Sequence, residues 1–253
     1  MIGIFDSGVG GLTVVKHIMQ TKPGESIVYF GDTARAPYGV LSNEQITAQS
    51  KQIMRFLVGF KPETVIIACN TICAACYDDL AGAFDVPVVE IITPTAQSCV
   101  SLPNVKKIGV IATDFTVRNN VYYDKIKQLN GDLEVYQQAC PDLTTIAERG
   151  LADSDEGRTA IRGYLKDLKD KGIDSLILGC THYPLFTKHI VEYLGKKVRL
   201  VSSAEININK TGQGVKPQIL DFYISGDPRL FKITANNLLG VEIEPIQIDI
   251  EKY

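Results

Sequence analysis

The sequence lacks any long uninterrupted run of apolar residues. Its most hydrophobic segments are broken by Asn, Asp or Gly before they reach the roughly 18 residues that a membrane-spanning helix needs. It also lacks an excess of charge of one sign, since 26 Lys and Arg stand against 29 Asp and Glu and leave a net charge of −3. That balance offers no electrostatic attraction for nucleic acid or anionic lipid. We therefore expect neither a membrane span nor a nucleic-acid partner.

Low-complexity segments and long charged runs are also missing, and we expect no signal peptide. Met1 leads directly into the apolar stretch Ile2–Phe5, without a basic segment or a small-residue cleavage site. We therefore expect a cytoplasmic protein, in which cysteines remain thiols. With 253 residues, the chain can bury a core without disulfides or metals. Each cysteine is then a small buried hydrophobe, a metal ligand or a reactive group. The six are Cys69, Cys73, Cys76, Cys99, Cys140 and Cys180.

Short β-rich runs alternate with longer helical patterns along the chain. This alternation predicts an α/β fold with mainly parallel sheets and helices on both faces. The expected strands are Ile2–Phe5, Ile27–Phe30, Thr64–Ala68, Val86–Glu90, Lys107–Ile111, Leu133–Tyr136, Ser175–Leu178 and Val198–Val201. The clearest helical patterns are Asn43–Val58, Arg118–Leu129, Asp155–Lys171 and Phe186–Leu194. The one linker-like stretch is Asn207–Lys216.

An internal repeat divides the chain into two similar parts. Ile2–Ser7 is echoed by Ile108–Thr113, and each reads as a buried strand that ends in a hydroxyl residue. Val65–Thr71 is echoed by Leu176–His182, with a cysteine at the matching point of each. The repeat predicts two pseudo-symmetric open α/β domains that face each other, with an active site in the cleft between them.

The two cysteines of the repeat are Cys69 and Cys180, and both follow an expected strand. In open α/β sheets, ligands bind beyond the carboxyl ends of the strands. If the halves face each other, the two thiols approach one bound molecule from opposite sides. Such an arrangement suits racemisation, in which one base removes a Cα proton and a second group returns a proton to the other face.

A thiol is a suitable base because its ordinary pKa of about 8.5 lies near working pH. The Cα proton of an amino acid is only weakly acidic, so the site must also stabilise developing negative charge with N–H and hydroxyl donors. Ser7, Asn70, Thr71 and Thr181 are candidates for these donors.

Three cysteines also support a different interpretation. Cys69, Cys73 and Cys76 form C-x3-C-x2-C, which resembles the iron–sulfur loop of radical S-adenosylmethionine enzymes. However, the small residues around Cys73 and Cys76 favour a packed helix, and an iron–sulfur site would leave Cys180 unexplained. For Cys99 and Cys140 we expect core positions. A protein that binds an amino acid without catalysis is a further alternative.

Asp6 begins the glycine-rich run Asp6–Gly11, which follows the first expected strand. The run lacks the full G-x-G-x-x-G spacing because Thr13 occupies the place of the last glycine, so it is a weak nucleotide-binding signal. A tight turn explains the glycines but not the acid, and Asp6 could tune a nearby thiol. His182, two residues after Cys180, could do the same on the other side.

Several motifs together resemble those of bacterial glutamate racemases. They are DSGVGGL (Asp6–Leu12), GDTARAPYG (Gly31–Gly39), ACNT (Ala68–Thr71) and GCTHYPL (Gly179–Leu185). Further similar segments are Ala112–Tyr123 and Phe222–Phe231, so the resemblance spans nearly the whole chain. As a set these motifs are highly specific.

The resemblance implies interconversion of L- and D-glutamate without pyridoxal phosphate, another cofactor or a metal, and a supply of D-glutamate for peptidoglycan. Cys69 would act on the D-enantiomer and Cys180 on the L-enantiomer, with Asp6, His182 and Glu148 in supporting catalytic roles. The implied substrate-binding residues are Asp6, Ser7, Tyr38, Gly39, Asn70, Thr71, Thr113, Thr116, Thr181 and His182. A small amino acid is the expected partner, and a second copy of the chain is a candidate one.

The resemblance further implies that the C-terminal segment returns to complete the first domain. That domain would comprise residues 1–93 and 206–253, with Asp6 and Cys69, and the second would comprise 94–205, with Thr113, Glu148 and Cys180. One segment departs from the family pattern, because the usual apolar run before Glu148 is replaced by the more polar Pro141–Ala147. A racemase for aspartate or another amino acid therefore stays an alternative.

Overall fold

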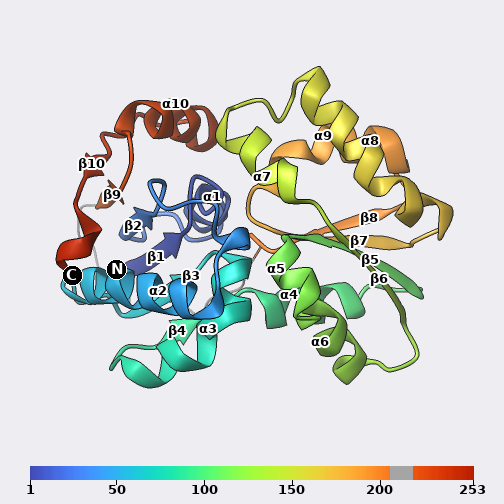
Figure 1. The fold of residues 1–253 in the computed structure, drawn as a ribbon, viewed down its shortest axis with the longest axis horizontal. Helices are drawn as coiled ribbons and strands as arrows, with labels where there is room; N and C mark the ends of the chain where they lie inside the picture. Colours follow the sequence, from blue (N-terminus) through green and yellow to red (C-terminus); the bar gives the residue numbers. More distant parts are fainter. Residues whose placement is uncertain (206–218) are drawn as a thin grey trace.

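The computed structural model describes residues 1–205 and 219–253, and these form two parallel sheets flanked by helices (Figure 1). The expected α/β class with parallel sheets is thus confirmed. The expected linker Asn207–Lys216 lies outside the described residues. The strands are β1 (Ile2–Asp6), β2 (Ile27–Gly31), β3 (Thr64–Ile67), β4 (Val88–Val89), β5 (Lys107–Ala112), β6 (Glu134–Ala139), β7 (Ser175–Gly179), β8 (Arg199–Ser202), β9 (Leu220–Ile224) and β10 (Ile246–Gln247).

The helices alternate with the strands as expected for parallel sheets. They are α1 (Leu12–Thr21), α2 (Asn43–Val58), α3 (Asn70–Ala83), α4 (Ile92–Val100), α5 (Asp114–Arg118), α6 (Val121–Leu129), α7 (Pro141–Glu148), α8 (Asp155–Asp170), α9 (Thr187–Leu194) and α10 (Pro228–Leu239). Short 3-10 turns lie at Tyr38–Val40, Tyr183–Phe186 and Ile250–Lys252. Within the described ranges, no helix is both long and apolar enough to span a bilayer.

The first sheet has the strand order β10-β9-β2-β1-β3-β4, and all its paired strands are parallel. Its central strands β1, β2 and β3 are buried along their whole length, because helices cover both faces of a parallel sheet. The chain returns to this sheet after the second half, so that the red C-terminal strand β9 lies beside β2 (Figure 1).

The second sheet has the order β6-β5-β7-β8. This repeats the order β2-β1-β3-β4 of the first sheet, so β5 corresponds to β1 and β7 to β3. The internal repeat in the sequence is therefore matched by a repeat in topology. We propose that each sheet is the core of one of the two domains expected above. The proposed boundary between residues 205 and 206 lies at the edge of the described part of the chain.

Helix α2 has the bounds that its sequence pattern predicts. Its start is fixed by a capping box, in which the Ser42 side chain accepts from the Gln45 amide and the Gln45 side chain accepts from the Ser42 amide. The helix expected over Arg118–Leu129 is present as α6 but begins later, at Val121, because Arg118 ends the separate helix α5. Asn120 adopts a left-handed conformation with φ 53°, which interrupts the helix.

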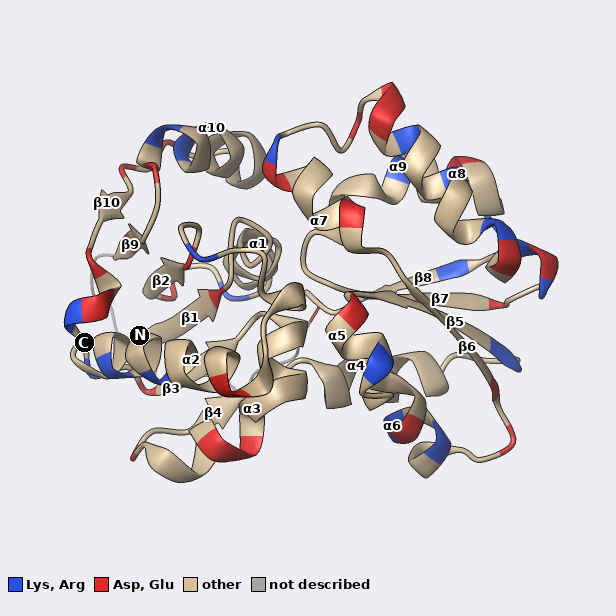
Figure 2. Ribbon diagram, viewed as in Figure 1, with Lys and Arg blue, Asp and Glu red and all other residues tan. Residues whose placement is uncertain are grey.

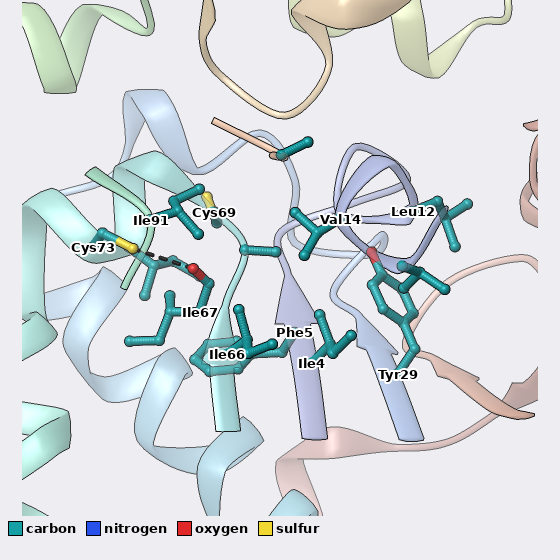
Figure 3. Close-up of a cluster of buried hydrophobic side chains, with 14 of the residues drawn as sticks. Ile4, Phe5, Leu12, Val14, Tyr29, Ile66, Ile67, Cys69, Cys73 and Ile91 are labelled. Atoms are coloured by element: carbon teal, nitrogen blue, oxygen red, sulfur yellow. Dashed lines mark hydrogen bonds between the residues drawn. The ribbon is translucent and has the colours of Figure 1, made fainter. Parts of the chain in front are cut away.

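The hydrophobic core consists of two clusters of buried side chains. The first includes Ile4, Phe5 and Ile66 of the first sheet (Figure 3) and extends to Ile108 and Val110 of β5 in the second half. The second cluster lies under α7, α8 and α9. Lys, Arg, Asp and Glu are interspersed along the outer helices and loops of both halves (Figure 2). The packing leaves the carboxyl ends of the central strands to face the junction of the two halves.

Candidate active site

The four repeated segments end at the carboxyl edges of corresponding strands. Ser7 follows β1, Cys69 follows β3, Thr113 follows β5 and Cys180 follows β7. All four residues line one narrow cavity of about 40 Å³. The fold therefore brings both cysteines of the repeat to one site between the halves, as parallel open sheets favour.

Most of the residues expected at the site line this cavity. They are Ser7, Tyr38, Gly39, Cys69, Asn70, Thr71, Thr113, Cys180, Thr181 and His182. Asp6, Thr116 and Glu148 do not line it, but each is hydrogen-bonded to a residue that does. These three side chains therefore help to fix the positions of the residues that line the cavity.

Cys69 is the residue just before helix α3 and is almost completely buried. Its Sγ lies 3.5 Å from Ser7 Oγ. Burial, followed by the nearby carboxylate of Asp6, raises the pKa of the Cys69 thiol to about 12. Without a substrate, Cys69 is therefore a thiol at neutral pH.

Cys180 follows the last residue of β7 and is equally buried. Its Sγ lies 3.5 Å from His182 Nδ1 and 3.9 Å from Thr144 Oγ1. Unlike Cys69, this thiol has an imidazole as a direct neighbour. A protonated imidazole would stabilise a thiolate at this position.

His182 connects Cys180 to a carboxylate. Its Nε2 lies 2.6 Å from Glu148 Oε1, and the same oxygen accepts a 3.0 Å hydrogen bond from the Val9 amide. Burial on its own lowers the pKa of the His182 ring, but the bonds to Cys180 and Glu148 and their charges outweigh it and raise that pKa well above its ordinary value. The ring is thus more basic than a free imidazole and bridges Cys180 and Glu148.

Asp6 is a fully buried carboxyl group at the end of β1. Its oxygens accept a 2.9 Å bond from the Gly8 amide and a 3.0 Å bond from the Thr181 hydroxyl. Burial raises the pKa of Asp6, and this effect exceeds the opposing influence of His182 and of the hydrogen bonds. Asp6 acts on Cys69 electrostatically, through the repulsion that raises the pKa of the Cys69 thiol.

Hydroxyl and amide groups surround the cysteines. Thr113 Oγ1 lies 2.9 Å from Thr71 Oγ1 and 3.0 Å from Thr116 Oγ1, so Thr116 fixes Thr113 from behind the cavity. Asn70 accepts a 2.7 Å bond from the hydroxyl of Tyr122 and donates a 3.0 Å bond to Ser203.

Tyr38 reaches the cavity from a loop of the first half. Its hydroxyl donates a hydrogen bond to the buried carboxylate of Asp32, which also pairs with Arg35 at 2.7 Å and accepts from Ser225 at 2.7 Å. A Cβ on the next residue, Gly39, would lie 3.2 Å from Thr113 Cβ, so glycine permits this loop to lie against the second half.

The glycine-rich run after β1 allows the halves to approach each other closely. A Cβ on Gly8 would lie 2.0 Å from Glu148 Oε1, and one on Gly10 would lie 2.4 Å from Thr181 Oγ1 and 2.7 Å from His182 Nδ1. Side chains at these positions would displace the groups beside Cys180. Close packing, rather than phosphate binding, accounts for these glycines.

Cys73 and Cys76 lie in helix α3, as expected for packed residues. Cys73 Sγ donates to the carbonyl of Ile67 at 3.3 Å, as Figure 3 shows, and Cys76 Sγ donates to that of Ile72 at 3.5 Å. In residues 1–205 and 219–253, no group of three or more His, Cys, Asp or Glu side chains is placed to hold a metal ion. Cys99 and Cys140 are fully buried, as expected.

Some site residues were not identified from the sequence. Four residues are hydrogen-bonded to expected site residues in the folded structure but were not predicted to do so, namely Thr144, Asp32, Ser203 and Tyr122. Two of them could have been found, because Asp32 lies inside the GDTARAPYG segment and Thr144 inside the unusually polar segment before Glu148.

Comparison with known proteins identifies the family of the chain. The family model for Asp/Glu/Hydantoin racemase matches residues 10–211. A glutamate racemase from Thermoanaerobacter sp. (strain X514) is 42% identical over 266 residues, which cover 100% of this chain and 98% of the relative.

Two solved structures share the fold over nearly their whole length. A glutamate racemase isoform from Bacillus anthracis has a TM-score of 0.90 at 35% identity, with 98% of this chain and 97% of that one covered. A glutamate racemase from Francisella tularensis subsp. tularensis in complex with D-glutamate has a TM-score of 0.87 at 33% identity, with 100% and 98% covered.

Proposed function

This chain belongs to the Asp/Glu/Hydantoin racemase family, and on that premise we propose that it is a glutamate racemase that uses Cys69 and Cys180 as its two bases. The observation that carries the proposal is the placement of both thiols. Each follows the corresponding strand of its own sheet, and both line one cavity. A racemase needs this arrangement, because its substrate must exchange a proton on each face of Cα.

In the L-to-D direction, the thiolate of Cys180 removes the Cα proton and the thiol of Cys69 donates its own proton to the opposite face. In the D-to-L direction the roles are exchanged. Each turnover leaves the proton count of the enzyme unchanged but moves the proton from one sulfur to the other. The two thiols must therefore be in opposite protonation states before the substrate binds.

The surroundings of the two sulfurs support this division. The pKa of Cys69, raised to about 12, favours the thiol there, while His182 Nδ1 lies 3.5 Å from Cys180 Sγ, where a protonated imidazole can pair with a thiolate. Glu148 holds the ring in place at 2.6 Å. On the other side, protonation of Asp6 removes a repulsion and lowers the free-energy cost of a thiolate at Cys69.

The carbanion-like transition state needs donors directed at the α-carboxylate. Ser7, Asn70, Thr71 and Thr181 line the cavity and can supply them, together with amides at the N-terminus of the 14-residue helix α3. We assign Tyr38, Gly39 and Thr113 to substrate contacts as well. Thr116 then acts through its bond to Thr113.

The enzyme would act in the cytoplasm, and its reaction would supply D-glutamate for the synthesis of peptidoglycan. We include a homodimer in the proposal as the form in which the chain would assemble.

The proposal is tested by Cα hydrogen exchange. The purified protein is incubated in deuterated water without added cofactor, with L-glutamate, D-glutamate, L-aspartate or D-aspartate. We expect deuterium at Cα of both glutamate enantiomers and little at aspartate. Exchange of aspartate alone would reassign the substrate within the family, and binding of glutamate without exchange would show a non-catalytic protein.

A further inference from the structure

One face of helix α7 contacts two consecutive parts of the site. Thr144 and Glu148 are four residues apart, so both project from the same side of the helix. Thr144 Oγ1 lies 3.9 Å from Cys180 Sγ, and Glu148 Oε1 lies 2.6 Å from His182 Nε2. The helix therefore contacts both the thiol and the imidazole beside it.

The other thiol has a matching hydroxyl, because Ser7 Oγ lies 3.5 Å from Cys69 Sγ. In the repeat, the counterpart of Ser7 is Thr113, at the end of β5. That hydroxyl is bonded to Thr71 and Thr116 instead of Cys180. The repeat therefore does not provide a hydroxyl for Cys180.

Thr144 fills this place from a different element. Its side chain is buried and lines the cavity, in a segment where the glutamate racemase pattern is usually apolar. A buried hydroxyl needs a hydrogen-bond partner, and a charged sulfur is a strong acceptor.

We infer that Thr144 is a positioning residue whose hydroxyl donates a hydrogen bond to the Cys180 thiolate and so stabilises the base that acts on the L-enantiomer. This inference rests on the proposed two-cysteine function. When Cys180 takes the Cα proton it becomes a thiol, while Thr144 keeps its own proton. The new S–H can then donate to the Thr144 oxygen, which again leaves both groups partnered.

Three variants separate the hydroxyl from the shape of the side chain. Thr144→Val keeps the branched shape but removes the donor, whereas Thr144→Ser keeps the donor and removes a methyl group. Thr145→Val makes the same chemical change at the next residue, which is exposed on the helix. It serves as the matched control.

The measurement is the alkylation of each thiol by iodoacetamide across a pH series, in the absence of substrate, with the Cys180 and Cys69 peptides quantified by mass spectrometry. In Thr144→Val we expect the pH midpoint of Cys180 alkylation to rise by about one unit, which means about tenfold less thiolate at a given lower pH. Thr144→Ser and Thr145→Val should stay near the native midpoint. Cys69, whose pKa is raised to about 12, should stay largely unmodified at neutral and mildly alkaline pH in every variant, and so reports that the site is intact.

Two results would overturn the inference. One is a native Cys180 midpoint in Thr144→Val, and the other is an equal shift in Thr144→Val and Thr144→Ser, which would show that packing rather than the hydroxyl is responsible. Cα exchange by the native protein is measured in parallel. If glutamate exchanges but the Cys180 midpoint does not shift, the role of Thr144 alone is wrong. If no amino acid exchanges, the proposed function is wrong whatever the alkylation shows.

Discussion

The hydroxyl of Thr181 donates a 3.0 Å hydrogen bond to the carboxylate of Asp6, and this bond joins the loop after β7 to the end of β1. Two further bonds also join the segment after β1 to the second half. Thr13 Oγ1 donates to the Thr181 carbonyl at 3.2 Å, and the Val9 amide donates to Glu148 at 3.0 Å. The site is therefore assembled from both halves, and groups beside one cysteine are held by the half that carries the other.

Replacing Asp6 by Asn should stabilise the fold while impairing turnover. The pKa of Asp6 is raised in the folded state, mainly by burial, so its contribution to stability is greatest below its unfolded pKa of about 3.9 and is lost as pH rises through the raised value. At pH 7 an unfolded Asp is ionised, so the burial of this carboxyl group makes the folded state less stable there than in acid. Asn can accept from the Gly8 amide through Oδ1 and donate from Nδ2 to the Thr181 hydroxyl, and it carries no ionisable group. We expect a higher Tm at pH 7 and a turnover reduced by about a hundredfold or more.

Thermal unfolding between pH 3.5 and 8 checks this prediction. The difference in Tm between Asp6→Asn and the native protein should shrink toward acid pH, where Asp6 is neutral. Asp132→Asn, in an exposed turn, is the control and should change Tm little at any pH. A Tm difference for Asp6→Asn that is independent of pH would contradict the account.

The parts of the fold that the sequence predicts are those determined by local pattern. The apolar runs at β1, β5 and β7 and the capped helix α2 are examples, because burial on both faces and a capping box leave clear signals. Strands β9 and β10 were not predicted. β10 has only two residues, and β9 is only partly buried and depends on its pairing with β2.

The residues of the candidate site also differ in how far the sequence predicts them. Cys69 and Cys180 could be found from the sequence because the repeat places them at matching points after a strand. Asp32 and Thr144 lie in segments that the sequence marks as notable, but their partners could not be predicted. The same holds for Ser203, because each of the three contacts depends on segments far apart in the chain or on a loop conformation. The exact partner of a side chain is a property of the folded packing.

Replacing either proposed base should abolish two-way racemisation. Cys69→Ser and Cys180→Ser keep similar size but offer a hydroxyl, which is a much weaker acid and base at neutral pH. We expect kcat for either enantiomer to fall by about a thousandfold or more. Cys99→Ser is the matched control, since that thiol is also buried but lies beside Ser175, away from the cavity. Circular dichroism or chiral chromatography measures the interconversion of the enantiomers. Near-native turnover by Cys180→Ser would contradict the two-base mechanism.

Replacing Glu148 by Gln should weaken the hold on His182 in a pH-dependent way. The pKa of His182 is raised in the folded state, since its bonds and charges outweigh burial, so the stability it contributes is full below its unfolded pKa of about 6.5 and is lost as pH rises through the raised value. Gln keeps an acceptor for the Val9 amide but removes the charge. We expect the stability difference between the native protein and Glu148→Gln to be largest below pH 6.5 and to shrink at higher pH.

Denaturant unfolding at several pH values measures this difference. Turnover by Glu148→Gln should also fall by about ten- to hundredfold, the amount expected for one hydrogen bond to a charged group. Glu156→Gln is the control, because Glu156 is exposed and pairs with Arg149 at 2.8 Å. If both variants show the same pH dependence, the contact between Glu148 and His182 is not its source.

A methyl group at Gly10 should disable the site without unfolding the protein. The added Cβ would lie 2.4 Å from Thr181 Oγ1 and 2.7 Å from His182 Nδ1, the atom that contacts Cys180. The ring must move to make room, and a displacement of about 1 Å in an active site can cost about a hundredfold in rate. For Gly10→Ala we therefore expect kcat to fall by about that factor, with a loss of about 1–3 kcal/mol in the free energy of unfolding. Gly163→Ala is the contrasting change, since Gly163 is exposed inside helix α8 and its added Cβ meets no atom within 4 Å. That variant should keep native kcat and gain about 1 kcal/mol of stability from helix propensity. Steady-state kinetics and denaturant unfolding of the two variants distinguish the predictions, and native kcat in Gly10→Ala would show that the close contact of the halves does not set the position of His182.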